Sequence, residues 1–326
     1  MRSRLVTHWP IFLSHMVTSY CDCKCRMCGY WKLGKREEMT FGQIQNMLVD
    51  ALRVGMSDYL IWGGEPLLRQ DTPEIIAYAN NIGLDTTIIT NGSFLAERID
   101  KIAPNLWGII VSLDHPNARQ HDHLRRFPGL FDKAIEGIER AKRYRHLRIF
   151  INCVIQKENI NQVQEMAEFA KDLGVRISYE MMEVIAGYND KFLPTRKEII
   201  QMSNQIIQMK YKGYPISNSS SYFRAIALRS PYSCQVPKIC VTVLWDGTVR
   251  LCQTISEDVK PPLVTNCELG NVTQTSFREL FLSRNYQRFV RAAEKCWRCD
   301  LSYPREIALL DSYDPDAIVN LFTKIL

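Results

Sequence analysis

Short apolar, β-branched segments alternate with helical patterns over the first 182 residues, and this alternation limits the possible folds more than any other feature. The segments typical of strands cover 11–17, 59–62, 86–90, 108–113, 148–155 and 177–181. The helical patterns between them cover 41–52, 73–82, 94–103, 130–143 and 161–173. Strands that alternate with helices form parallel sheets with right-handed crossovers. Six such repeats fall short of a closed eight-stranded barrel, so we predict an α/β fold, a partial (β/α)6 TIM-like barrel.

The ends of the predicted helices carry local signals. Thr40 precedes helix 41–52 and is a suitable N-cap, because its hydroxyl can accept a hydrogen bond from a free backbone N–H. Gly83 and Gly174 follow helices 73–82 and 161–173, where a left-handed residue ends a helix. These signals support the predicted bounds.

The pattern changes in the last third of the chain. A helix is predicted over 194–214, followed by a Ser/Asn-rich loop at 217–221 and a β-hairpin at 239–252 around Asp246-Gly247. Helices are predicted near 276–295 and 314–325. We therefore predict a barrel domain over 1–190, a linker helix and loop over 191–221, and a small α+β domain over 222–326.

Charge and hydropathy exclude several classes of protein. The 41 Lys and Arg residues are interleaved with 35 Asp and Glu residues, so the net charge of +6 forms no stripe typical of a nucleic-acid interface. No apolar segment reaches the roughly 18 residues of a membrane span. Segment 9–17 lacks the cleavage site of a secretion signal. We expect a cytoplasmic protein with neither a nucleic-acid partner nor a membrane span.

The chain has 11 cysteines, and most fall into two clusters. In a reducing compartment, clustered thiols bind metal more often than they form disulfides. In the first cluster, Cys21, Cys25 and Cys28 have the spacing Cys-x3-Cys-x2-Cys and follow the first predicted strand. One interpretation is a zinc site completed by Cys23 or a distant thiol. The other is an iron–sulfur cube with one open iron, in which Cys23 is not a ligand.

Further polar motifs follow the next strands in order: Gly63-Gly64-Glu65-Pro66, Thr90-Asn91-Gly92, Ser112-Leu113-Asp114, and then His121 to Arg125. Each one alone is typical of a turn or a helix cap. Together with the three-cysteine loop, over about residues 11–182, the ordered set resembles the radical S-adenosylmethionine (SAM) superfamily.

This resemblance implies an enzyme with defined cofactors. Cys21, Cys25 and Cys28 would hold a [4Fe–4S] cluster, and SAM would chelate its fourth iron. An external reductant such as flavodoxin or ferredoxin would supply the electron for SAM cleavage, and the resulting 5′-deoxyadenosyl radical would abstract a hydrogen atom from substrate. The implied SAM-binding residues are Gly63, Gly64 and Glu65 for the ammonium, Ser112 and Arg125 for the carboxylate or ribose, Asn91 in the same cavity, and Ile155 against the adenine.

The second cysteine cluster lies in the predicted small domain. Cys234 and Cys252 flank the hairpin, and Cys296 and Cys299 have the spacing Cys-x2-Cys. This arrangement resembles the twitch domain, a shortened SPASM domain. The resemblance implies that Cys234, Cys252, Cys296 and Cys299 bind one auxiliary [4Fe–4S] cluster, with Cys240 as an alternative ligand. A zinc ribbon has similar spacing and stays open as the other interpretation.

An auxiliary cluster with four thiolates favours electron uptake from a substrate radical, and so an oxidoreductase-type dehydrogenation, whereas three thiolates would leave an iron free to bind substrate. Only 20 residues precede Cys21, so we expect no peptide-recognition domain and predict a small-molecule substrate, such as a sugar, an alcohol or a lipid-like compound. A peptide-modifying enzyme and a non-catalytic iron–sulfur protein for electron transfer or sensing are the alternatives. The candidates for acid–base catalysis are Glu180, Glu183 and Tyr188, which follow the sixth strand.

Overall fold

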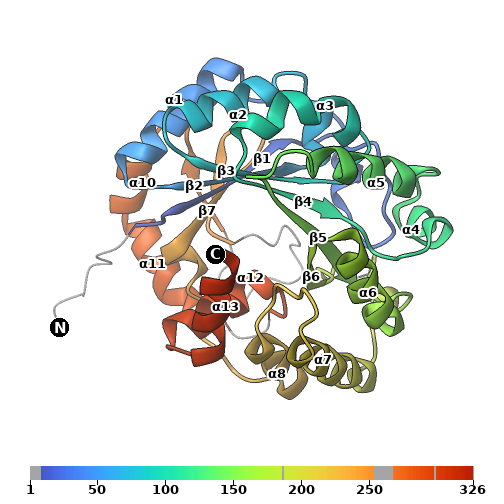
Figure 1. Ribbon diagram of the computed structural model, residues 1–326. Coiled ribbons are helices and arrows are strands. Elements are labelled where there is room, and N and C mark those ends of the chain that lie inside the picture. The colour runs from blue at the N-terminus through green and yellow to red at the C-terminus, as the bar shows by residue number, and fades with distance from the viewer. Residues whose placement is uncertain (1–8, 186, 253–266, 297–298, 326) are drawn as a thin grey trace.

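The computed structural model describes residues 9–185, 187–252, 267–296 and 299–325. Its centre is one nine-stranded sheet in the order β6-β5-β4-β3-β2-β1-β7-β8-β9. Six parallel strands form the partial barrel that the sequence predicts: β1 (Phe12–Thr18), β2 (Asp58–Gly63), β3 (Asp85–Thr90), β4 (Gly108–Ser112), β5 (Arg148–Ile155) and β6 (Arg176–Met181). Figure 1 shows these strands as a curved sheet with helices around its outer face.

The outer layer consists of helices that follow the strands. They are α1 (Phe41–Arg53), α2 (Thr72–Asn81), α3 (Leu95–Ile102), α4 (Ala118–Arg125), α5 (Leu130–Ala141) and α6 (Val163–Leu173). Alternate residues of each strand, such as Leu13 and Val17 of β1, join the helices in the main core. The intervening residues face the inside of the barrel; there, Ser14 of β1 accepts a hydrogen bond from Trp62 Nε1 of β2 at 2.8 Å.

The predicted helix ends are confirmed. Thr40 forms a capping box with Gln43 at the start of α1. Gly83 and Gly174 follow α2 and α6 with φ of 96° and 73°. These local signals act over one turn of backbone, so the surrounding fold does not override them.

The C-terminal part adds three strands to the same sheet: β7 (Cys240–Val243), β8 (Thr248–Arg250) and β9 (Glu268–Asn271). The predicted hairpin around Asp246-Gly247 joins β7 to β8 in antiparallel pairing. β7 itself pairs in parallel with β1, and Cys240 lies opposite Phe12. The hairpin therefore continues the barrel sheet, while the boundaries 1–190, 191–221 and 222–326 stay a prediction.

The remaining helices are α7 (Arg196–Tyr211), α8 (Ser220–Leu228), α9 (Val236–Ile239), α10 (Phe277–Leu282), α11 (Arg284–Ala293), α12 (Ser302–Asp311) and α13 (Pro315–Ile325). Two expectations were wrong here. The predicted loop 217–221 contains the start of α8, since the Ser219 side chain accepts a hydrogen bond from the Tyr222 N–H and caps the helix. The predicted helix 276–295 breaks at Ser283, which ends α10 in an extended conformation and caps α11.

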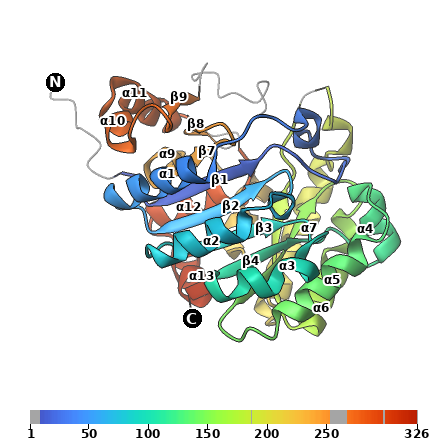
Figure 2. The same cartoon turned by 90° about the horizontal axis from the view of Figure 1, so that it is seen from above.

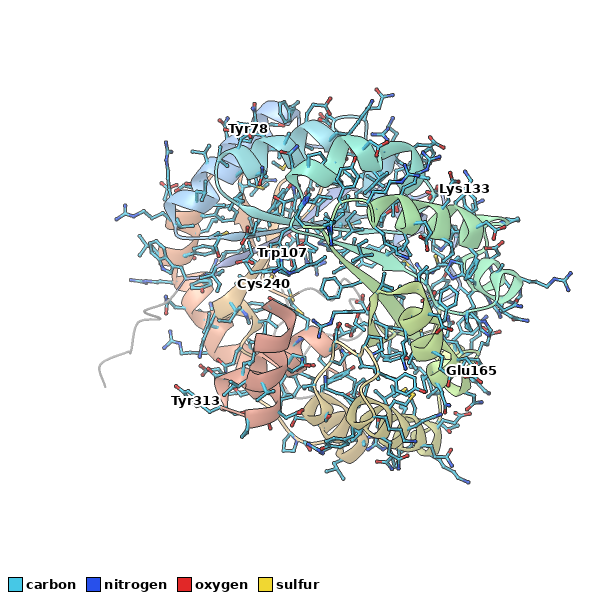
Figure 3. All side chains as sticks on the ribbon, viewed as in Figure 1. Tyr78, Trp107, Lys133, Glu165, Cys240 and Tyr313 are labelled. Atoms are coloured by element: carbon cyan, nitrogen blue, oxygen red, sulfur yellow. The ribbon has the colours of Figure 1, made fainter. Side chains whose placement is uncertain are left out.

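Helix α12, which the sequence did not predict, connects the two sides of the open barrel. Glu180 of β6 accepts hydrogen bonds from the backbone and hydroxyl of Ser302, at the start of α12. Ile307 and Tyr303 of the same helix pack near Cys240 of β7. Figures 1 and 2 show α12 and α13 beside the sheet, and Figure 3 labels Cys240 toward the middle of the molecule. In the described part of the chain, no helix has both the length and the apolar character that a bilayer crossing requires.

Candidate active site and cysteine clusters

The first cysteine loop begins just after β1, at the carboxyl edge of the parallel strands. Cys23 and Cys25 are buried with Met27, Leu130 and Met182, and Cys21 and Cys28 pack against this small cluster. All four cysteines are free thiols. The loop thus gathers its thiols in a largely apolar pocket of side chains, where an uncompensated negative charge is costly.

The thiols of this loop affect one another strongly. Cys23 hydrogen-bonds to Cys21 and Cys25, which raises its pKa, while the pKa of Cys25 is lowered by the same bond. Burial, followed by the charge of Cys25, raises the pKa of Cys28 to about 12. A soft cation that binds several thiolates would relieve this crowding, so the donor set fits an iron–sulfur cluster or zinc.

Two groupings of ligands are possible in this loop. The ligand atoms of Cys21, Asp22 and Cys23 lie within 4.8 Å of one another, whereas the sequence spacing singles out Cys21, Cys25 and Cys28. Iron–sulfur clusters are held by thiolate ligands rather than carboxylates, so Asp22 is the weaker candidate. Asn91 Nδ2 donates to Asp22 Oδ1 at 2.7 Å and to Cys23 Sγ at 3.2 Å, while Asp22 Oδ2 is buried without a hydrogen-bond partner among the described residues.

Glu65 is the centre of the hydrogen bonds that tie the next two loops together. Its side chain is fully buried and accepts bonds from Leu67 N at 2.9 Å, Thr90 Oγ1 at 2.8 Å and Asn91 N at 2.7 Å. Burial is the largest cause and raises the pKa of Glu65 to about 7, although the three hydrogen bonds act to lower it. A carboxylate has about four acceptor positions, so one position remains for a cationic group such as an ammonium.

The Gly63-Gly64 segment passes directly against the cysteine loop. Gly64 N donates to Thr18 O at 2.9 Å, and Glu65 N donates to Tyr20 O at 2.8 Å. A Cβ atom on Gly64 would lie 2.0 Å from Tyr20 O, and one on Gly63 would lie 2.5 Å from Thr18 O. Only glycine permits this approach, which places the loop after β2 next to Cys21.

Arg125 and Asp114 form a buried ion pair beside the thiols. Arg125 Nε and Nη2 donate to Asp114 Oδ2 and Oδ1 at 2.6 and 3.0 Å, and Nη1 lies 4.0 Å from Cys25 Sγ. Asp114 Oδ1 also accepts from Val154 N at 2.9 Å. The sequence signal for Asp114 was its place two residues after Ser112, but its pairing with Arg125 was not visible there. Ser112 ends β4, opposite Asn152 of β5.

The structure does not bring Ile155 to this group. Ile155 packs in the main core with Ile151 and Cys153, on the helix side of β5. Its neighbour Val154 packs against the thiol cluster instead. Because side chains alternate along a strand, a shift of one residue reverses the face.

The loop after β6 covers the cysteine loop. Asn189 Nδ2 donates to Met27 O at 2.6 Å and to Glu183 O at 2.8 Å, and Tyr188 Oη donates to Cys28 O at 3.2 Å. Sequence reasoning missed Asn189, because nothing in its local pattern distinguishes it from a turn residue. Of the other acid–base candidates, Glu180 of β6 accepts a hydrogen bond from Ser302 at the start of α12, whereas Tyr188 contacts the cysteine loop.

The second cysteine cluster lies at the opposite edge of the sheet. Cys240 pairs with the first residue of β1, and β8 runs antiparallel to β7, so Cys252 also lies toward that edge. Burial first, and then the thiols of Cys296 and Cys252, raise the pKa of Cys234 to about 12. Burial, Cys252 and Cys234 likewise raise the pKa of Cys299. The four thiols thus share one environment. Cys240 lies beside it, because Cys240 and Cys234 pack in one cluster with Tyr303, and after burial both raise the pKa of Tyr303.

This group fits a tetrahedral sulfur site. The hydroxyl oxygen of Tyr232, beside the thiols, is buried and has no hydrogen-bond partner among the described residues. A metal centre would supply sulfur acceptors for it. Four thiols alone suit both zinc and an iron–sulfur cluster.

The charges of thiols from both clusters act on the side chain of Tyr30. Burial raises the pKa of Tyr30, and among the charges that act on it are both Cys28 of the first cluster and Cys252 of the second. Its ring meets Trp62 of β2 edge-on, with 5.6 Å between the centroids.

Family models match two parts of the chain. Residues 16–170 match the radical SAM superfamily, and residues 234–300 match the SPASM iron–sulfur cluster-binding domain. The first match contains the loops at the carboxyl edge of the barrel, and the second contains six cysteines, which are the five named for the opposite edge and Cys267. The second also favours iron–sulfur over zinc at that edge.

Individual relatives agree with the family models. The chain is 29% identical to an AdoMet-dependent heme synthase of Methanosarcina barkeri over 57% of this chain and 54% of that one. It is 31% identical to a GTP 3′,8-cyclase of Acidothermus cellulolyticus over 48% of this chain and 47% of that one. The matched segment thus spans about half the length of these relatives.

The fold is similar to that of SuiB from Streptococcus suis, solved with S-adenosylmethionine and with the precursor peptide SuiA. The TM-scores are 0.72 and 0.70 at 16% identity, over 87% of this chain and 68% and 67% of the other. At this identity the matches show a shared fold. The chain therefore belongs to the radical SAM superfamily, whose cofactors are a [4Fe–4S] cluster and SAM, and it carries a SPASM iron–sulfur domain after the barrel.

Proposed function

We propose that this enzyme cleaves SAM reductively at a [4Fe–4S] cluster held by Cys21, Cys25 and Cys28, and abstracts a hydrogen atom from a small molecule. The observation that carries this proposal is the junction of three loops at one edge of the barrel. There the glycines after β2 contact the cysteine loop, and Glu65 holds the loop after β3. When bound, the cluster and SAM supply a 5′-deoxyadenosyl radical.

The residues around the thiols give SAM its orientation in this proposal. Glu65 and the Gly63-Gly64 backbone hold the ammonium through the remaining acceptor position of the carboxylate. Ser112 and Arg125 hold the carboxylate or ribose, with the Arg125 guanidinium fixed by Asp114. Asn91 fixes the cysteine loop through Asp22 and Cys23. Val154, rather than Ile155, is the β5 side chain placed to contact the adenine.

The four thiols of Cys234, Cys252, Cys296 and Cys299 hold one auxiliary [4Fe–4S] cluster in this proposal. A cluster held by four protein thiolates would supply an electron acceptor for a substrate radical, and the net reaction would then be a dehydrogenation. External flavodoxin or ferredoxin delivers the first electron.

The substrate class is proposed from the relatives. The names of the matched curated relatives, a heme synthase and a GTP cyclase, refer to small molecules. A sugar, an alcohol or a lipid-like compound is the proposed class for this chain. A peptide substrate is the second candidate, because SuiB has been solved with a precursor peptide on a similar fold.

The experiment is an anaerobic assay of the reconstituted protein with dithionite and SAM. We expect 5′-deoxyadenosine from the wild type and none from Cys28→Ala. We expect Cys299→Ala to cleave SAM without forming product, because the electron acceptor is lost. A wild type whose reducible cluster never cleaves SAM would show a non-catalytic electron-transfer or sensor protein instead.

The two substrate classes are separated by the same assay with fractionated cell extract. A small-molecule substrate requires that the low-molecular-weight fraction stimulates 5′-deoxyadenosine formation and that protease treatment of the extract leaves this stimulation unchanged. Stimulation that resides in the peptide fraction and is lost after protease treatment would establish the peptide candidate.

A further inference from the structure

Tyr232 occupies an unusual position at the second cysteine cluster. It lies two residues before Cys234, and its hydroxyl oxygen is buried without a hydrogen-bond partner among the described residues. The guanidinium of Arg305 stacks on its ring, 4.2 Å from the centroid. A buried hydroxyl without a partner is costly, so a group that accepts its hydrogen bond is expected in the loaded protein.

Arg305 fixes this ring between the two segments that carry the thiols. The residue is 3% exposed, and its Nε donates to Cys299 O at 2.8 Å. Its Nη1 donates to Ser230 O at 2.5 Å, and Nη2 to Asp300 Oδ1 at 3.0 Å. One cation thus joins the backbone before Cys234 to the backbone at Cys299, and the tyrosine ring lies against it.

Geometry links Tyr232 to the cysteines: it precedes Cys234 by two residues, and Arg305, which stacks on its ring, donates to Cys299 O. Burial raises the pKa of Tyr232, and the next causes are the thiols of Cys299, Cys234 and Cys296. A sulfur of the centre that these cysteines would bind is a suitable acceptor for the unpartnered hydroxyl. Hydrogen bonds to the sulfurs of an iron–sulfur cluster stabilise its more negative, reduced state and raise its reduction potential.

We propose that Tyr232 is a positioning residue of the auxiliary centre: its hydroxyl donates a hydrogen bond to a sulfur of that centre and makes it a better electron acceptor. Arg305 holds the ring in place for this bond. The inference rests on the proposed function, in which Cys234, Cys252, Cys296 and Cys299 bind the auxiliary cluster.

The test is a redox titration, followed by EPR, of the reconstituted wild type and of Tyr232→Phe. We expect Tyr232→Phe to keep about eight irons and to shift the auxiliary midpoint to lower potential. A lost bond to a charged acceptor corresponds to about tenfold in the one-electron reduction equilibrium, or about 59 mV. The potential of the SAM-binding cluster is expected to stay unchanged.

Tyr286→Phe is the matched control. Tyr286 is buried in the same part of the chain, but its hydroxyl already donates to Pro237 O at 2.9 Å. Its replacement is expected to leave both potentials unchanged. An equal shift in both variants would mean that the loss of any buried hydroxyl changes the centre, and would overturn the inference.

Other outcomes are decisive as well. An unchanged auxiliary potential in Tyr232→Phe overturns the proposal. A folded Tyr232→Phe with about four irons overturns it as well, because the proposed hydrogen bond tunes the auxiliary centre and is not needed to assemble it. If Tyr232→Phe does not fold, Arg305→Lys replaces it: the charge stays but the planar stack is lost, and the potential must fall. A wild type with only about four irons refutes the auxiliary cluster itself and this inference with it.

Discussion

Cys23 distinguishes the two possible ligand sets of the first cysteine loop. Its thiol is buried and accepts a hydrogen bond from Asn91, but it lies outside the Cys-x3-Cys-x2-Cys spacing. We expect Cys23→Ser to keep about four irons at this site and to cleave SAM, because a serine hydroxyl also accepts from Asn91. Cys25→Ser is expected to lose the cluster. Iron and sulfide counts of the two variants check these expectations. If Cys23→Ser loses the iron and Cys25→Ser keeps it, Cys23 is a ligand.

The ion pair of Arg125 with Asp114 is a residue-scale test of stability. Asp114 is fully buried, so Asp114→Asn leaves the guanidinium without its counter-charge. We expect the free energy of unfolding to fall by about 3–5 kcal/mol, measured with urea on the metal-free protein. The control is Glu136→Gln, which breaks an exposed pair with Arg140. Its effect is expected to stay within about 0.5 kcal/mol, and equal losses in both variants would contradict the argument.

At the scale of the elements, the contact between the loops after β1 and β2 depends on Gly64. Its added Cβ would meet Tyr20 O at 2.0 Å, so Gly64→Ala forces the two loops apart. A displacement of about 1 Å costs about 100-fold in rate, and we expect a loss of that size in 5′-deoxyadenosine formation. Gly42→Ala on α1 is the control, because nothing lies within 4 Å of its added Cβ. Full activity of Gly64→Ala would show that the contact does not position SAM.

The sequence predicted the elements best where local signals and the hydrophobic period agree. All six barrel strands lie within one residue or so of the predicted segments, and the Thr40 cap forms as expected. The extra helices failed for a physical reason: Ser219 and Ser283 are typical of loops by composition, and only their backbone conformation makes them caps. Helix α12 depends on Glu180 of β6, a contact that no local pattern encodes.

In the candidate site, too, the sequence predicted what local motifs encode and missed the contacts between residues that are distant in the chain. Motifs at consecutive strand ends could be placed together, because the carboxyl ends of parallel strands share one edge. Their partners could not: Asp114 with Arg125, and Arg305 with Tyr232, are distant in sequence and meet only in the folded chain. The proposed adenine contact differs from the sequence prediction by one residue, with Val154 in place of Ile155, because a shift of one residue reverses the strand face.

For the molecule as a whole, buried titratable groups give opposite pH dependences. Burial, and then the charge of Arg69, lowers the pKa of His15 from 6.5 to about 3. Between these values the unfolded chain takes up a proton that the folded protein does not, so stability falls as the pH falls, by up to about 1.4 kcal/mol per unit. Glu65, with its pKa raised from 4.5 to about 7, acts in the other direction between those two values.

The His15 contribution can be isolated with its partner Tyr59, whose hydroxyl lies 2.7 Å from His15 Nδ1. Removing both groups avoids an unpaired buried atom. We expect the double variant His15→Leu with Tyr59→Phe to lose less stability than wild type on acidification below pH 6.5. Urea unfolding at a series of pH values measures this, and Tyr59→Phe alone, which keeps the histidine, is expected to retain the wild-type slope. Parallel curves for all three proteins would contradict the assignment.

The pairing of β7 with β1 means that the SPASM part is not a detachable module. β1 has neighbours on both sides, so a truncation that removes residues 222–326 would turn it into an edge strand with unpaired backbone groups. We expect such a truncated protein to self-associate, as measured by light scattering, whereas the full-length Cys234→Ser, which keeps β7, is expected to stay monodisperse. Transplanting this barrel into another enzyme would therefore require an equivalent strand to protect its exposed flank.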